Sequence, residues 1–127
     1  MRAIHDFRPF VPSNDYEISK AFYQRIGFTV NWDRGEICEI DTNFGFRFLL
    51  QSKNHDNYAR SLMLHFTVNS AQEWYGHLES LQLSDAFPGT KVAPPELMPW
   101  GLVVAYAWDP AGVLLHFAEK PNPDTTR

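Results

Sequence analysis

The sequence predicts an α+β fold in which one strand–helix–three-strand unit, βαβββ, occurs twice along the chain. Its 127 residues suffice for one core but not for two, so both units are expected in one domain, residues 1–120. Helical and strand periodicities follow one another in the same order in both halves. The closing strands also match, because residues 45–53 (GFRFLLQSK) align with residues 112–120 (GVLLHFAEK) at their glycine, lysine and aliphatic positions.

The first module, residues 1–56, begins with a strand and a helix. Residues 3–12 mix apolar and polar positions around two prolines, which predicts an edge or loosely paired strand. Residues 13–15 (SND) are helix-capping residues, and the apolar positions after them recur at spacings of three and four, as in an amphipathic helix that ends at Gly27. These apolar positions are Ile18, Ala21, Phe22 and Ile26. Three strands are then expected at residues 28–32, 36–40 and 44–51, followed by a polar turn over residues 52–60.

The second module, residues 57–120, repeats this order. A strict alternation predicts a strand over residues 62–68, and Asn69-Ser70 caps a helix with one apolar face. That face carries Trp74, Leu78 and Leu81. The Pro- and Gly-rich residues 84–99 leave room for one short strand at 91–93. Two final strands, at residues 100–108 and 113–119, flank the turn DPAG at 109–112. Residues 121–127 are expected to form a flexible tail.

Composition and charge narrow the range of possible functions. A net charge of −4, with the eleven Lys and Arg residues scattered singly, argues against a nucleic-acid partner. Charged residues near the N-terminus and the lack of a long apolar run predict neither a signal peptide nor a membrane segment. The lone cysteine, Cys38, is expected to be a buried free thiol in a cytoplasmic protein. Aromatic residues make up 15% of the chain, which favours either a core of large residues or a cavity walled by rings.

Three segments resemble one superfamily. Residues 21–28 (AFYQRIGF) look like the helix end of the vicinal oxygen chelate superfamily, which contains glyoxalase I, extradiol dioxygenases and bleomycin resistance proteins. Residues 64–68 (LHFTV) open the second module as in that superfamily, and residues 99–101 (PWG) lead to the turn at 109–112 as in its bleomycin-resistance branch. The resemblance implies that the two modules form one curved, cup-like mixed β-sheet with the helices outside. It also implies a homodimer whose ligand lies in a cleft shared by two chains.

Catalytic members of this superfamily hold one divalent metal with four side chains, from the first and last strand of each module. The resemblance places Arg8, Leu49, Met63 and His116 at these positions. Arginine and leucine offer no lone pair and a thioether is a poor ligand for such metals, so no metal and no other cofactor are expected. A shift of two residues exchanges Met63 for His65, and His65, His116 and Gln51 then form an alternative three-ligand set for one divalent metal.

The function expected first is a metal-free, non-catalytic protein of the bleomycin-resistance type that sequesters a flat or aromatic small molecule. The expected ligand-binding residues are Arg8, Phe10, Arg47, Phe48, Leu49, Met63, His65, Trp100 and His116, although the strand alternation also allows Phe48 to point outward. As buried cations need partners, Arg8 and Arg47 are expected to pair with Glu36, Glu39 or an anionic ligand. Two alternatives remain open. One is a metal-dependent glyoxalase- or dioxygenase-like enzyme that uses His65 and His116, and the other is a partner-binding module that uses its outer surface.

Overall fold

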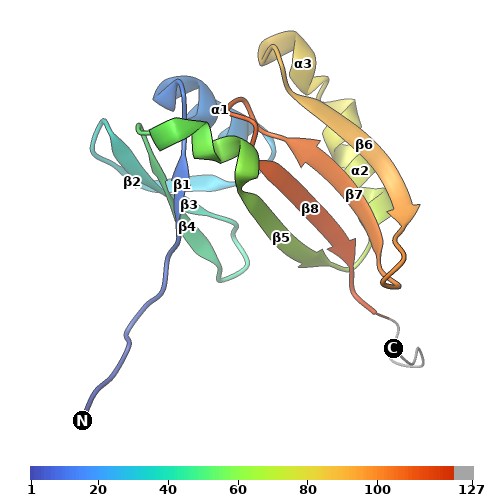
Figure 1. Cartoon of the computed structure of the whole chain (residues 1–127), viewed down its shortest axis with the longest axis horizontal. Helices are drawn as coiled ribbons and strands as arrows, with labels where there is room; N and C mark the ends of the chain where they lie inside the picture. The colour runs from blue at the N-terminus through green and yellow to red at the C-terminus, as the bar shows by residue number, and fades with distance from the viewer. Residues whose placement is uncertain (122–127) are drawn as a thin grey trace.

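The computed structural model describes residues 1–121, so all but the first residue of the tail predicted over 121–127 lies outside the described residues. The first module contains β1 (Phe10–Pro12), α1 (Tyr16–Arg25), β2 (Thr29–Asp33), β3 (Ile37–Asp41) and β4 (Arg47–Gln51). After the 3₁₀ segment η1 (His55–Ser61), the second module contains β5 (Met63–Val68), α2 (Ala71–Ser80), α3 (Leu83–Ala86), β6 (Lys91–Leu97), β7 (Val103–Trp108) and β8 (Leu114–Glu119) (Figure 1). The α+β class and the repeated βαβββ order are confirmed.

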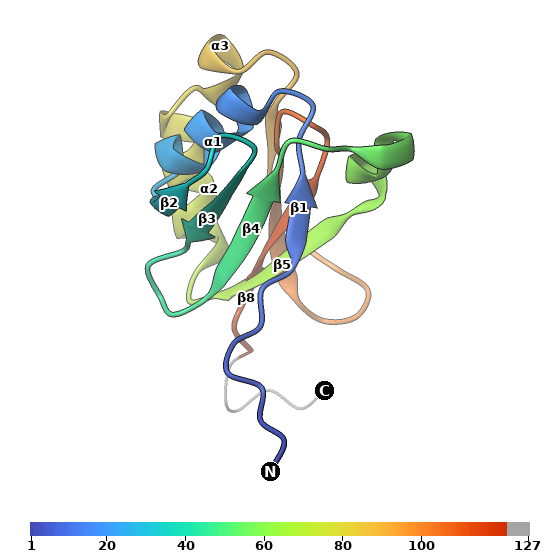
Figure 2. The same cartoon turned by 90° about the vertical axis from the view of Figure 1, so that its left-hand side faces the viewer.

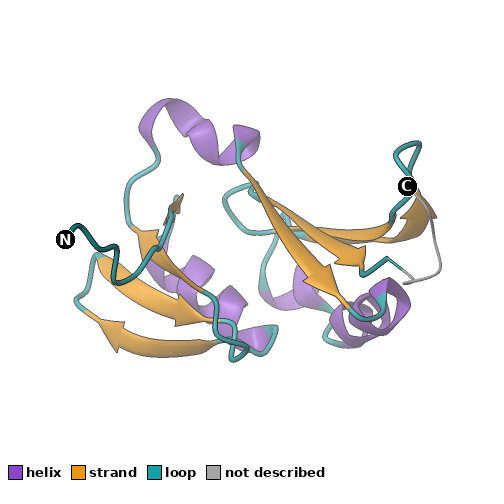
Figure 3. Cartoon of the chain, turned by 90° about the horizontal axis from the view of Figure 1, so that it is seen from below, coloured by secondary structure: helices purple, strands orange, loops and turns teal. Residues whose placement is uncertain are grey.

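The eight strands form two four-stranded mixed sheets, ordered β1-β4-β3-β2 and β5-β8-β7-β6. Each module's first strand runs parallel to its last, and the remaining pairs are antiparallel. Among the described residues no strand pair joins the two sheets, so the modules form two separate sheets and not the one continuous, cup-like sheet that was predicted. Figure 3 shows the two sheets side by side, with α1 and α2 on the same side of them and η1 crossing from one module to the other.

Several boundaries differ from those predicted. Only Phe10–Pro12 of the expected strand at 3–12 pairs with another strand, and the preceding residues extend away from the sheet (Figure 2). The final turn before β7 takes residues from the predicted strand at 100–108, because the Gly101 N–H donates to the Met98 carbonyl over 2.9 Å. The edge strand β6 is longer than predicted and contains a register shift between Ala93 and Glu96.

Helix α1 begins as predicted, since the Asp15 side chain accepts a hydrogen bond from the Ile18 N–H over 3.2 Å. Its buried face is formed by Ser19, Phe22, Tyr23 and the C-cap Ile26, which lie at spacings of three and four. Ile18 was expected on this face but is 41% exposed, because it lies beside that stripe and not on it.

Helix α2 follows its prediction more closely. The Ser70 hydroxyl accepts from the Glu73 N–H over 3.1 Å and caps the helix. Leu78 is buried, and the Trp74 ring stacks on Phe117 of β8 with centroids 4.7 Å apart. The helix therefore covers one face of the second sheet. No described helix has the length and apolar character needed to cross a membrane.

One buried hydrogen bond connects the two modules. The Tyr23 hydroxyl of α1 donates to Asp109 Oδ2 over 2.7 Å, and Asp109 is 1% exposed in the turn before β8. The other carboxylate oxygen, Oδ1, accepts from the N–H groups of Ala111 and Val113 over 2.8 and 2.9 Å. Burial raises the pKa of Asp109, against the lowering effect of these hydrogen bonds. The turn itself thus supplies the donors for Oδ1, whereas Oδ2 depends on correct docking of α1 against the turn.

Aromatic rings surround this bond and also cross between the modules. Phe28, just before β2, contacts Phe66 of β5 and Trp74 of α2, with centroids 5.9 and 6.5 Å apart. Phe22 contacts Phe87 edge-on at 5.7 Å. The relative position of the two sheets is therefore fixed by an aromatic cluster with one polar bond inside it.

Replacing Tyr23 with phenylalanine is expected to lower the free energy of unfolding by about 1–3 kcal/mol, because Asp109 Oδ2 then stays buried without its donor. Urea denaturation measures this change. Tyr75→Phe is the matched control: its hydroxyl contacts the carboxylate of the exposed Glu79 on the outside of α2, so its loss should cost less than about 0.5 kcal/mol. Equal stability of the Tyr23→Phe variant and the parent would contradict the structural role of this bond.

Candidate functional site

Each sheet has one face covered by its helix and one face that is open. In the first sheet, Phe48 packs edge-on against Tyr23 of α1 at 5.1 Å, so its neighbours Arg47 and Leu49 point to the opposite, open face. In the second sheet, Phe117 packs against α2, so His116 points to the open face. Of the expected ligand-binding residues, Phe48 therefore lies on the helix-covered side, where it is 4% exposed.

The open face of the second sheet, called here the aromatic face, consists of rings and a thioether. His65 of β5 lies directly opposite His116 of β8, which lies opposite Tyr106 of β7. The two histidine Nδ1 atoms are 3.5 Å apart, and the Tyr106 ring meets His116 edge-on at 5.1 Å. Trp108 stacks on Tyr106 at 6.2 Å, and Met63 is 60% exposed beside His65. This surface suits an aromatic ligand.

The open face of the first sheet, called here the ionic face, is built around Glu39 of β3. Glu39 is 4% exposed and accepts hydrogen bonds from Arg8 Nη1 over 2.6 Å and from Asn31 Nδ2 over 2.8 Å. Arg47 Nη1 lies 3.8 Å from the same carboxylate, and Arg47 Nη2 donates to Asp6 over 2.9 Å. The Asn31 amide and the two guanidinium groups lower the pKa of Glu39, although its burial opposes them. Glu39 is thus the partner that both arginines required.

A cavity of about 830 Å³ lies between the two modules and is lined by aromatic residues from both. It is bounded by β4 and the loop before it on one side and by β5 and the start of α2 on the other. Four expected ligand-binding residues line it: Arg47, Phe48, Met63 and His65. Strand β5 contributes side chains to both this cavity and the aromatic face, so the two regions form one continuous candidate site.

The other expected ligand-binding residues do not line this cavity. Phe10 lies opposite Leu49 on the open face of the first sheet, where Phe10 is 50% exposed. Arg8 belongs to the ionic face. His116 lies on the aromatic face, and Trp100 is 49% exposed in the turn between β6 and β7.

Several aromatic residues that line the cavity were not among the expected ligand-binding residues. They are Phe28, Phe44, Phe46, Phe66, Trp74 and Phe117. Phe44 and Phe46 are 77% and 74% exposed in the loop before β4. The high aromatic content was the only sequence signal for such a wall. Strand alternation does not show that the helix-covered face of a sheet, which carries Phe66 and Phe117, can open onto a cavity.

The residues present do not fit the divalent metal that the superfamily resemblance implies. Strand register places Phe10 opposite Leu49 and His65 opposite His116, so both first strands are shifted by two residues from the Arg8 and Met63 positions expected above. Phenylalanine and leucine supply no lone pair. Gln51 lies in the other sheet from the histidines, and its amide donates to the Tyr58 hydroxyl over 3.2 Å. Among the described residues no group of three His, Cys, Asp or Glu side chains is arranged to hold a metal.

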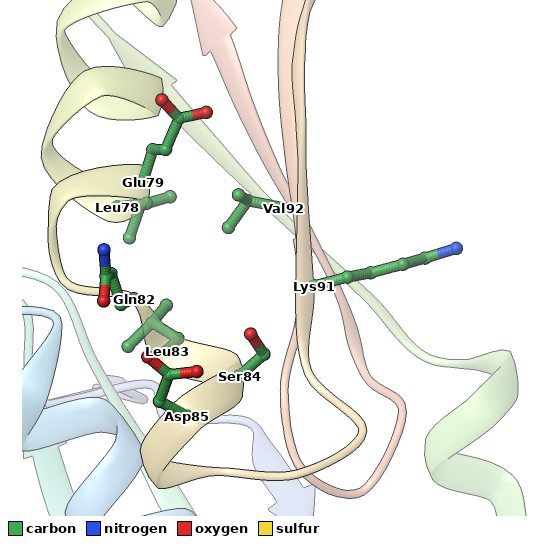
Figure 4. A pocket seen from close by; sticks show the side chains of 8 residues that line it. All are labelled: Leu78, Glu79, Gln82, Leu83, Ser84, Asp85, Lys91 and Val92. Carbon is green, nitrogen blue, oxygen red and sulfur yellow. The ribbon is translucent and has the colours of Figure 1, made fainter.

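A second, smaller hollow of about 380 Å³ lies behind the second sheet, between the end of α2, α3 and the start of β6. Figure 4 shows Leu78, Leu83 and Val92 pointing toward one another, while the Lys91 side chain points away from the helices. These apolar contacts are packing between α2, α3 and β6, and we do not assign a site there.

Known proteins share both sequence and fold with this chain, although no family model matches it. A bleomycin resistance protein from Klebsiella pneumoniae is 26% identical over 114 residues, which cover 88% of this chain and 90% of that protein. A bleomycin-binding protein solved with bleomycin has a TM-score of 0.77 at 22% identity, covering 93% of this chain and 100% of that one. A glyoxalase-related enzyme from Fulvimarina pelagi has a TM-score of 0.69 at 21% identity, covering 97% and 96%.

The fold is therefore one that bleomycin-binding proteins and a glyoxalase-related enzyme share. In sequence, the chain is similar to a bleomycin resistance protein. The resemblance found in the sequence is confirmed. Because the same fold supports both sequestration and catalysis, the function has to be argued from the site.

The histidine pair gives a measurable property of the site. Burial and the neighbouring His65 lower the pKa of His116. Replacing His65 with asparagine removes the second of these effects, so the pKa of His116 should rise toward its ordinary value. Titration of the ring protons by NMR measures this pKa. An unchanged pKa in the variant would show that the two imidazoles do not interact.

Proposed function

We propose that this chain is a non-catalytic binding protein that sequesters a flat, aromatic small molecule between its two modules. The observation that carries the proposal is the cavity of about 830 Å³, which is within the range of small-molecule sites and is walled mainly by aromatic and aliphatic side chains. A few polar groups, including Arg47, His65 and Glu73, lie among them and can orient a ligand. The relationship to a bleomycin resistance protein supports the same function.

The charges of the ionic face bear on the kind of ligand. Two arginines in a cup would oppose a cationic drug if they were unpaired. Here Arg8 and Arg47 are matched by Asp6 and Glu39 in one network, so this network carries no net charge. A cationic aromatic antibiotic is therefore compatible with the site, and the chain's net charge of −4 favours its approach.

We further propose that the protein is a homodimer in the cytoplasm, with residues 1–120 as one domain divided into modules at about residue 56. Residues 1–9 extend from the first sheet (Figure 2) and carry exposed apolar side chains. Met1, Ile4 and Phe7 are 120%, 89% and 81% exposed, and such a segment is favourable only when a partner surface covers it. A second copy of this chain is the partner that we propose. The buried free thiol of Cys38 is compatible with a reducing compartment.

Titration with a panel of aromatic antibiotics that includes bleomycin tests the binding function. A true ligand should quench tryptophan fluorescence, and at 100 times its Kd it should stabilise the protein by about 2.7 kcal/mol. Phe46→Ala should weaken binding about tenfold, because its ring lines the cavity. Ile18→Ala, on the exposed side of α1, is the matched control and should bind normally. If no member of the panel changes fluorescence or melting temperature, sequestration is not the function.

Removal of residues 1–5 tests the dimer and keeps Asp6 and Arg8, the partners of Arg47 and Glu39. We expect the parent chain to sediment as a dimer and the shortened chain as a monomer, because the exposed Met1 and Ile4 are gone. Analytical ultracentrifugation distinguishes the two. The double variant Ile4→Ser, Phe7→Ser keeps the arm and should also weaken association. A parent chain that sediments as a monomer at all concentrations would contradict the proposal.

A further inference from the structure

The paired histidines of the aromatic face have a defined hydrogen-bonding state. Nδ1 of His65 and Nδ1 of His116 are 3.5 Å apart, with the rings inclined at 71°. When both imidazoles are neutral, this contact is favourable only if one Nδ1 carries the proton and the other accepts it, since two lone pairs or two N–H groups would repel. The pair therefore shares one proton between its Nδ1 atoms.

This sharing determines whether each Nε2 atom can donate or accept a hydrogen bond. A neutral imidazole has one N–H group, so the histidine that donates through Nδ1 has a lone pair at Nε2. The histidine that accepts through Nδ1 carries its proton at Nε2. The pair thus presents one donor and one acceptor, and the opposite arrangement forms when both imidazoles change tautomer by exchanging protons with water.

Neither Nε2 atom is used by the protein within the described part of the chain, where the only hydrogen bond of either ring is the one between them. Among those residues, the one buried side-chain polar atom without a partner is Ser19 Oγ, so His116 Nε2 is not sealed in the core. Both groups are therefore free for a ligand.

The surroundings favour a neutral, planar group at this position. Tyr106 and Trp108 of β7 provide rings beside His116, and Lys91 of β6 lies over the Trp108 ring, 4.4 Å from its centroid. Burial and the negative charge of Glu96 of β6 raise the pKa of Tyr106. Arg47 of β4 lines the cavity together with His65. None of these charged groups forms an ion pair with either imidazole among the described residues.

We propose that the His65–His116 pair recognises a carboxamide or lactam group on the aromatic ligand, by donating to its oxygen and accepting from its N–H. This inference rests on the proposed binding function and specifies the ligand class. A carboxylate can accept one of these hydrogen bonds but faces a lone pair at the other nitrogen. An ester has no N–H to give. Because both imidazoles can change tautomer through water, the amide can bind in either orientation.

Three probes with one ring system test the proposal: naphthalene-2-carboxamide, its methyl ester analogue and naphthalene-2-carboxylate. Calorimetry with the full-length protein, in buffer with EDTA, should show the carboxamide binding about tenfold more tightly than the ester, because the ester leaves one imidazole nitrogen unpaired. His65→Phe should abolish this preference while the ester keeps its affinity. Tyr106→Phe, on the same face, is the matched control and should keep the preference.

The other outcomes are decisive as well. If no probe binds, the binding function itself fails and the inference falls with it. If the carboxamide and ester bind equally, or if the carboxylate binds best, the proposed function stands but the amide preference is overturned. A preference that is seen only without EDTA would also overturn it, because a metal ion and not the shared proton would then select the ligand. The melting temperature of each variant verifies that it is folded.

Discussion

The hydrogen bond between Tyr23 and Asp109 is the contact on which the arrangement of the two modules depends. It places a polar bond inside an otherwise apolar junction, where an unpaired carboxylate would be costly. Rings such as Phe28 supply the bulk of the junction, but apolar contacts tolerate sliding more readily than a directional bond. This bond fixes α1 of the first module against the turn before β8 of the second, and the cavity lies between the same two modules.

The two open faces have diverged although the modules that carry them repeat the same topology. At matched positions the first sheet has Phe10 and Leu49, whereas the second has two histidines. Around them, the first face gathers charged side chains into a neutralised network and the second gathers rings. The two open faces therefore differ in chemistry, one being ionic and the other aromatic.

Local sequence patterns predicted the fold well and the site only in part. Features that depend only on neighbours within a few residues could be predicted from the sequence. These are the caps at Asp15 and Ser70, the apolar stripe on α2 and the alternation in β5. The position of His65 opposite His116 was predicted only as an alternative, two residues from the expected Met63, because register between distant strands depends on long-range pairing. The wall formed by Phe44 and Phe46 was missed for a related reason. Nothing local in a loop shows which module it will face.

Strand β6 is also longer than the sequence predicted. Pro94 and Pro95 interrupt it at its register shift. Prolines remove N–H donors from the outer edge of the second sheet, and such an edge is a poor template for another strand. The opposite edge of that sheet, β5, has no interruption of this kind. Protection against edge-to-edge aggregation is thus built into the outer side of this sheet alone. Any strand added from another chain is directed to the side where the cavity lies.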